Sequence, residues 1–183
     1  MARLYLVRHG EPSGTWTDST DPGLSPLGRE QAEEAAKRLR EFGALDVVTS
    51  PLRRARETAA PFAAYRSRSP TIAEAVAEIP TPRAIALANR GEWLRSVMTG
   101  KWSEADRPQQ EWRALVVAYL LGLPRDTAVF SHYIAINVAV AAARRDDRVT
   151  VFAPTHASVT ILDTTALGLT EVELGRTGQT IVR

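Results

Sequence analysis

The chain has 183 residues, of which 44% are hydrophobic and 24% are charged, a composition typical of one globular domain. Its formal net charge of +2 gives no sign of a basic face for nucleic acid, and no apolar run is long enough for a membrane span or a secretory signal. The absence of cysteine excludes disulfides, zinc–thiolate sites and cysteine nucleophiles. We therefore expect a single cytoplasmic domain over residues 1–183 that binds neither nucleic acid nor membrane.

Short β-rich runs alternate along the chain with longer helical patterns. This alternation predicts an α/β protein in which helices cover a parallel sheet. The expected strands are residues 3–7, 45–48, 127–130, 149–152 and 159–162.

Helix signals lie between these strands. Ser25-Pro26 is typical of a helix start and Gly43 of a helix end, and between them apolar residues recur at helical spacing. A second helix is expected to open at Ser50-Pro51 and to kink or end at Pro61, and a third is expected to be capped by Ser131. Residues 80–122 are expected to form two further helices, joined by a polar stretch at 99–109, that cover the active site.

Three polar clusters each follow directly after an expected strand. They are Arg8-His9-Gly10-Glu11, Ser50-Pro51-Leu52-Arg53-Arg54 and Ser131-His132. Because ligands bind outside the carboxyl ends of the strands of an open parallel sheet, we expect two histidines and at least two arginines to converge on one crevice. Two helix N-termini beside them add free N–H groups that suit a phosphate dianion. The sequence therefore predicts an anion-binding site.

Phosphate chemistry sets clear demands on such a site. Phosphate monoesters hydrolyse extremely slowly without a catalyst, so an enzyme must supply a nucleophile and neutralise the phosphate oxygens. A neutral imidazole is a competent nucleophile when one ring nitrogen is free and a hydrogen bond holds the other. A carboxylic acid with a raised pKa must then protonate the departing alkoxide.

The Arg-His-Gly-Glu cluster at residues 8–11 resembles the signature of the histidine phosphatase superfamily, also called the phosphoglycerate-mutase-like superfamily. Further matches follow in the family's order as far as about residue 162. They are the loop and helix start at 21–32, the second motif at 50–59, the second histidine motif at 131–132 and the strand at 157–160. The resemblance implies a three-layer α/β/α sandwich with a mostly parallel central sheet.

The resemblance also implies roles for individual residues. His9 is identified as the phosphorylated nucleophile, and Arg8, Arg54 and His132 as the phosphate pocket around it. No metal and no cofactor are implied.

Glu78 is the implied general acid. Its interval of 24 residues from Arg54 (78 − 54) is similar to that in small phosphatases of the family. Glu74 is the competing candidate, and Glu11 is a weaker one because it belongs to the nucleophile loop itself.

Three positions depart from the family pattern or lie outside it. Tyr133 stands where glycine usually follows the second histidine, and it is expected either to narrow the pocket or to point away. Thr15 stands where mutase-type members often have asparagine, and it is a candidate phosphate contact. His156 matches no family role, so we expect it in a structural or rim position.

The resulting functional hypothesis is a metal-independent phosphomonoesterase that acts on a small phosphorylated substrate through a phosphohistidine at His9. A phosphoglycerate-mutase-like phosphotransferase is the alternative, but the long basic, tyrosine-bearing insertion of mutases has no counterpart here. An alternative of another class is a catalytically weak phosphate-ligand-binding or scaffold protein, which Tyr133 and the open choice of acid would favour.

Overall fold

A six-stranded mixed sheet forms the centre of the molecule. The computed structural model describes residues 1–14 and 21–178, and its strands lie in the order β3-β2-β4-β1-β5-β6. Strands β1, β2, β3 and β4 pair in parallel, whereas β5 and β6 are antiparallel to their neighbours. The strands are β1 (Arg3–Arg8), β2 (Asp46–Thr49), β3 (Thr71–Ile72), β4 (Thr127–Ser131), β5 (Val159–Thr165) and β6 (Gly168–Glu173).

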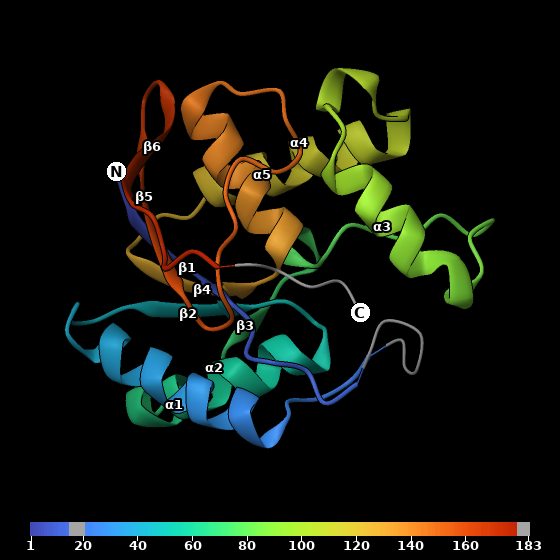
Figure 1. Cartoon of the computed structure of the whole chain (residues 1–183). Coiled ribbons are helices and arrows are strands. Elements are labelled where there is room, and N and C mark those ends of the chain that lie inside the picture. Colours follow the sequence, from blue (N-terminus) through green and yellow to red (C-terminus); the bar gives the residue numbers. More distant parts are fainter. Residues whose placement is uncertain (15–20, 179–183) are drawn as a thin grey trace.

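Helices cover both faces of this sheet, as Figure 1 shows. Helices α1 (Pro26–Arg40) and α2 (Arg53–Arg66) lie on one face. The other face carries α4 (Arg107–Leu121) and α5 (Tyr133–Arg144), with α3 (Arg90–Met98) beside them. The short 3₁₀ helices are η1 (Glu74–Val76), η2 (Leu87–Asn89) and η3 (Trp102–Glu104). The predicted three-layer α/β/α sandwich with a mostly parallel sheet is therefore confirmed.

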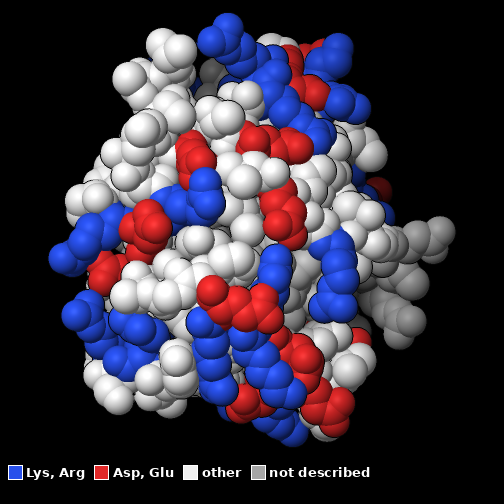
Figure 2. All heavy atoms as spheres, turned by 90° about the vertical axis from the view of Figure 1, so that its left-hand side faces the viewer, with Lys and Arg blue, Asp and Glu red and all other residues white. Residues whose placement is uncertain are grey.

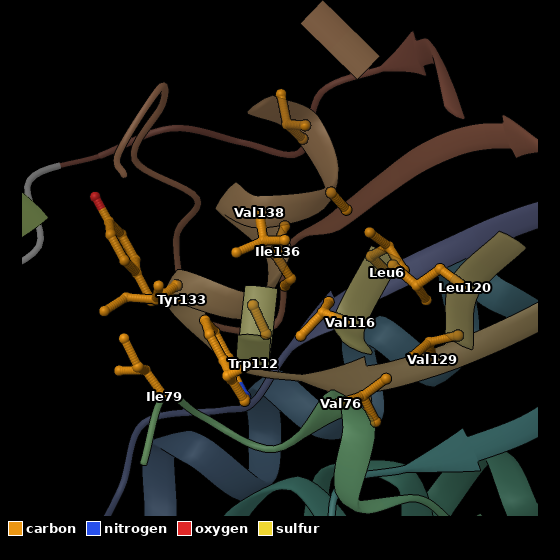
Figure 3. Packing of buried hydrophobic residues seen from close by; sticks show 14 of the residues in the cluster. Leu6, Val76, Ile79, Trp112, Val116, Leu120, Val129, Tyr133, Ile136 and Val138 are labelled. Carbon is orange, nitrogen blue, oxygen red and sulfur yellow. The ribbon is translucent and has the colours of Figure 1, made fainter. Parts of the chain in front are cut away.

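The alternation of side chains along β1 produces two separate cores. Leu4 and Leu6 point to the α4–α5 face and join its apolar cluster, whereas Tyr5 and Val7 point to the α1–α2 face and join the other. This period of two is what a strand buried on both faces requires. Figure 3 shows the first cluster, in which Val116 and Leu120 of α4 lie near Leu6 and Val129 of the sheet.

The sequence signals for α1 are confirmed. The Ser25 hydroxyl accepts a hydrogen bond from Gly28 N at 2.9 Å, Pro26 occupies the first helical position, and Gly43 follows the helix with φ of +80°. The buried face consists of Gly28, Ala32, Ala35, Ala36 and Leu39. The two helices expected within residues 80–122 are also present, as α3 and α4.

Several predicted elements are wrong in detail. Residues 149–152 form no strand, because the Asn137 side-chain oxygen accepts the N–H groups of Val151 and Phe152 at 2.8 and 3.1 Å. Pro61 does not end α2, which continues to Arg66, so that alternative is wrong, and a kink at Pro61 stays a prediction. An interior proline removes one backbone hydrogen bond and crowds the preceding turn, but burial of Phe62 and neighbouring alanines holds this helix against the sheet.

The predicted serine caps at the second and third helices are also wrong. The N-cap positions belong to Leu52 and His132, one or two residues later. Ser131 is the last residue of β4, and its hydroxyl donates to the Val76 carbonyl at 2.7 Å. The edge strands β3 and β6 were not expected from the sequence.

Charges of both signs are interspersed on the face drawn in Figure 2. Ion pairs in the described chain, such as Arg144 with Glu171 at 2.7 Å, also bring charges of opposite sign together. None of the helices within the described ranges combines the length and the apolar character that a membrane crossing needs.

Candidate active site

His9 lies at the end of β1, beside the end of β4. Its backbone N–H donates to the Ser131 carbonyl at 3.0 Å, and its side chain is 2% exposed. Nδ1 lies 2.7 Å from the Gly10 carbonyl oxygen. Because a carbonyl can only accept, Nδ1 carries the proton and Nε2 keeps its lone pair. Burial and, after it, the nearby Arg54 lower the pKa of His9 well below its usual range, so the ring is neutral.

The loop that carries His9 is packed tightly against the two helices beneath it. A Cβ added at Gly10 would lie 2.5 Å from the Gly28 carbonyl oxygen, so only glycine allows this approach. Gly10 N donates to the Thr58 hydroxyl at 2.9 Å, and that hydroxyl donates to the Arg54 carbonyl at 2.7 Å. The contacts fix the nucleophile loop to α1 and α2. Thr58 lies within the motif at residues 50–59, and the sequence gives no sign of this contact.

His132 faces His9 from the start of α5, with 5.2 Å between the ring centroids. Its Nε2 lies 2.7 Å from the Ser50 hydroxyl, which also accepts from Leu52 N at 3.2 Å. Within the described chain, Nδ1 of this fully buried ring has no hydrogen-bond partner. If Ser50 donates to Nε2, then Nδ1 carries a proton that can be donated to an anion. Burial and the charge of Arg54 lower the pKa of His132 well below its usual value.

Arg8 and Arg54 bring two buried cations to the same place. Arg8 is 6% exposed and Arg54 is 2% exposed, and burial lowers the pKa of Arg8 to about 10 and lowers that of Arg54. Both groups remain charged at neutral pH. One Arg54 nitrogen lies 4.0 Å from the Asp21 carboxylate. Buried guanidinium groups are the strongest bidentate partners for phosphate oxygens in proteins.

Glu78 is the buried carboxyl group of the site. Its oxygens accept from Ile79 N at 3.0 Å and from Ile134 N at 3.4 Å. Burial raises the pKa of Glu78, although the two backbone hydrogen bonds and the charges of Arg54 and Arg8 oppose the rise. Figure 3 shows that Ile79, which follows Glu78 in the chain, lies with Trp112 and Tyr133 at one end of the apolar cluster.

The other two acid candidates lie elsewhere. Glu74 opens η1 and is exposed. The Glu11 carboxylate accepts from the Ser25 hydroxyl at 2.8 Å, next to the start of α1. Of the three carboxyl groups, Glu78 alone is buried.

Side chains bind one N–H group at each of the two helix N-termini that were expected to offer free N–H groups. Arg53 N at the start of α2 donates to Asp21 at 2.8 Å, and Ile134 N at the start of α5 donates to Glu78. Asp21 was part of a matched loop in the sequence but had no role assigned to it. The expectation of free N–H groups at these two positions is wrong.

The structure places the remaining predicted residues as follows. Thr15 lies outside the described residues. Tyr133 is 7% exposed, and the Arg8 guanidinium carbon lies 5.0 Å from its ring centroid. Arg90, the first residue of α3, is close enough for Glu78 to affect its pKa, which burial lowers. Sequence reasoning missed Arg90 because no motif marks the 80–122 segment.

Taken together, the described residues form an anion site of a definite chemical kind. A neutral imidazole with a free Nε2 lies beside a second neutral imidazole, two buried guanidinium groups and a carboxyl group of raised pKa. Such a set can hold a phosphate dianion, attack its phosphorus atom and protonate a departing oxygen.

Comparison with known proteins adds the family. The model of the histidine phosphatase superfamily (branch 1) matches residues 4–177. The chain belongs to this superfamily. The resemblance to this superfamily that the sequence motifs indicate is thereby confirmed.

Solved structures share the histidine phosphatase fold over nearly the whole chain. A mycobacterial glucosyl-3-phosphoglycerate phosphatase complexed with VO3 is 22% identical, with a TM-score of 0.73 and coverage of 97% of this chain and 100% of that one. A phosphoserine phosphatase from Entamoeba histolytica, in complex with 3-phosphoglyceric acid, is 20% identical, with a TM-score of 0.75 and coverage of 97% and 98%.

One curated superfamily relative matches over a short segment. It is the "Probable phosphoglycerate mutase GpmB" of Erwinia tasmaniensis, which is 37% identical over 65 residues. The match covers 32% of this chain and 29% of the relative's length.

Proposed function

We propose that this chain is a phosphomonoesterase that works through a phosphohistidine at His9 and needs no metal ion. The observation that carries the proposal is the state of His9. Its Nδ1 proton is held by the Gly10 carbonyl, and its free Nε2 lies among Arg8, Arg54 and His132. A neutral nucleophile surrounded by cations and donors suits attack on a phosphate dianion.

In the first step, His9 Nε2 attacks phosphorus and the bond from phosphorus to the leaving oxygen breaks. Arg8, Arg54 and a proton on His132 Nδ1 stabilise the charge on the remaining phosphate oxygens. Glu78 in its protonated form gives its proton to the leaving oxygen. The raised pKa of Glu78 keeps that proton available closer to neutrality than an exposed glutamate would.

In the second step, water attacks the phosphohistidine. Glu78, now a carboxylate, takes a proton from the attacking water, and the phosphorus–nitrogen bond breaks. The electron pair of that bond returns to His9 Nε2, and inorganic phosphate is released. Glu78 thus ends the cycle protonated and ready for the next substrate.

The activities of proteins with the same fold support a small phosphorylated metabolite as substrate. Two of the structures with the same fold are named phosphatases, of glucosyl-3-phosphoglycerate and of phosphoserine. A phosphoglycerate-mutase-like transfer is the second candidate, favoured by the short match to the Erwinia protein. It would use the same first step but return the phosphoryl group to a substrate.

The test is hydrolysis of para-nitrophenyl phosphate with EDTA present, over about pH 4.5 to 8. We compare the wild type with His9→Ala, with vanadate binding as the measure of an intact pocket. Turnover that survives EDTA and is lost in His9→Ala is the expected result. Turnover in both proteins would refute the role of His9. Vanadate binding without turnover in either protein would favour the ligand-binding alternative.

A further inference from the structure

Three residues to which the family motifs assign no role contact the Arg8 guanidinium group. One guanidinium nitrogen donates to the Pro154 carbonyl at 2.7 Å. Another lies 3.1 Å from Nε2 of His156. The Tyr133 ring covers the group at 5.0 Å. His156, for which a structural or rim position is expected from the sequence, has its ring centroid 5.7 Å from that of His9.

The contact between Arg8 and His156 fixes the chemical state of the imidazole. Arginine has only donors, so His156 Nε2 must accept, and its proton must sit on Nδ1. A charged imidazolium could not accept this bond and would also repel the guanidinium. Burial and the charge of Arg8 lower the pKa of His156 to about 4, which agrees with a neutral ring.

The backbone around His156 is built to hold that ring against Arg8. Ala157 adopts a left-handed conformation with φ of +54°, which is unusual for a residue with a side chain. In this conformation its N–H donates to the Arg8 carbonyl at 3.0 Å, and Arg8 N donates to the Ser158 carbonyl at 3.2 Å. A further backbone hydrogen bond holds the same turn, from Thr155 N to the Arg176 carbonyl at 2.8 Å.

We propose that His156 is a positioning residue for Arg8: as a neutral acceptor, it fixes the guanidinium for phosphate binding. The role rests on the proposed function only in that Arg8 is taken to bind the phosphate. His156 acts through Arg8 and needs no contact with the substrate. Loss of the acceptor frees one side of the guanidinium and weakens phosphate binding more than it slows the chemical step.

The tautomer of His156 is the first test, and it requires neither substrate nor turnover. The chain has three histidines, so long-range ¹H–¹⁵N correlation spectra can be assigned with one substitution at each. At neutral pH we expect the Nδ1–H tautomer for His156. The Nε2–H tautomer, or a charged ring, would overturn the proposal.

The second test uses variants at His156 and vanadate binding measured by calorimetry. His156→Leu removes the acceptor and should weaken vanadate binding about tenfold, with a matching rise in KM and a smaller change in kcat. His156→Gln can place an amide oxygen near the position of Nε2, and it should recover binding to within about threefold of the wild type. Equal binding by the wild type and the leucine variant would overturn the proposal. If the leucine variant does not fold, His156→Asn takes its place, since the shorter amide does not reach Arg8.

A double-mutant cycle separates positioning from direct contact. In an Arg8→Ala background, His156→Leu should cause no further loss of vanadate binding, because the group it holds is gone. An equal loss in both backgrounds would show that His156 touches the anion itself. A wild type that binds no vanadate would instead refute the proposed function, and the tautomer would still be decided independently by the spectra.

Discussion

Replacement of the buried carboxyl group, Glu78→Gln, separates its proposed role as an acid from a merely structural one. The side chain keeps its shape, and its amide oxygen can still accept from Ile79 N. The second contact, 3.4 Å from Ile134 N, is lost if the amide nitrogen takes that position. A long hydrogen bond of this kind contributes about 1 kcal/mol at most. We therefore expect a small fall in the free energy of unfolding and a pocket that still binds vanadate.

The effect on the rate depends on the leaving group. A positioned general acid contributes about 10²- to 10⁴-fold when the departing oxygen needs a proton. An alkyl phosphate should therefore lose about that factor in kcat. The para-nitrophenolate ion leaves without a proton, so the burst of para-nitrophenolate that accompanies phosphorylation of His9 should slow only about a few-fold, although the turnover that follows also loses the base that activates water. Because the acid must be protonated, the wild-type rate on the alkyl ester should fall as pH rises past the raised pKa of Glu78. The glutamine variant should lack this dependence.

The exposed competitor supplies the matched control. Glu74→Gln should change neither rate nor vanadate binding, since its carboxyl group faces solvent. Equal slowing of the phosphorylation step with both esters in Glu78→Gln would refute proton donation by this residue. A loss on the alkyl ester in Glu74→Gln alone would transfer the role to Glu74.

Two further predictions concern stability. Gly28→Ala should lower the free energy of unfolding, measured by urea titration, by about 3 kcal/mol, because the added Cβ would lie 2.1 Å from the Glu11 carbonyl oxygen. The control is Gly91→Ala, whose added Cβ has its nearest contact at 3.8 Å and which should stabilise α3 by up to about 1 kcal/mol. Equal effects of the two substitutions would contradict the packing argument. Acid should also destabilise the fold: the three histidines have lowered pKa values when folded, so below about pH 6.5 the unfolded chain binds protons that the folded chain does not. As the pH falls from about 7.5 to 5.5, this difference lowers the free energy of unfolding by up to roughly 4 kcal/mol. The raised pKa of Glu78 partly offsets the loss, because the folded state holds that proton more tightly than the unfolded state. Unchanged urea midpoints over that range would refute neutral histidines in the folded state.

The sequence predicted those parts of the fold that local signals determine. The cap at Ser25 and the alternation along β1 depend on residues close to one another in the chain, and both are present in the structure. The segment 149–152 has the composition of a strand, yet the side chain of Asn137 takes two of its N–H groups. No local pattern reveals such a competitor.

The candidate site likewise contains residues that sequence motifs predict and contacts that depend on residues far apart in the chain. His9, Arg54 and His132 each follow an expected strand of a parallel sheet, so their convergence at the carboxyl ends was predictable and is present in the structure. The contact between Arg8 and His156 joins residues 148 positions apart and depends on the strained turn at Ala157. That turn has no glycine to mark it in the sequence. The role of Asp21 at the start of α2 was hidden for the same reason, since a loop residue 32 positions away makes the contact.

The phosphorylated residue itself gives the most direct test of the account. The wild-type protein is mixed with a phosphomonoester, quenched with alkali during turnover, digested and examined by mass spectrometry. We predict a phosphoryl group on the peptide that contains His9, stable in alkali and lost in acid, that forms at least as fast as product and is absent from His9→Ala. Steady turnover with no phosphoryl group on His9, or with one on another residue, would contradict the central claim.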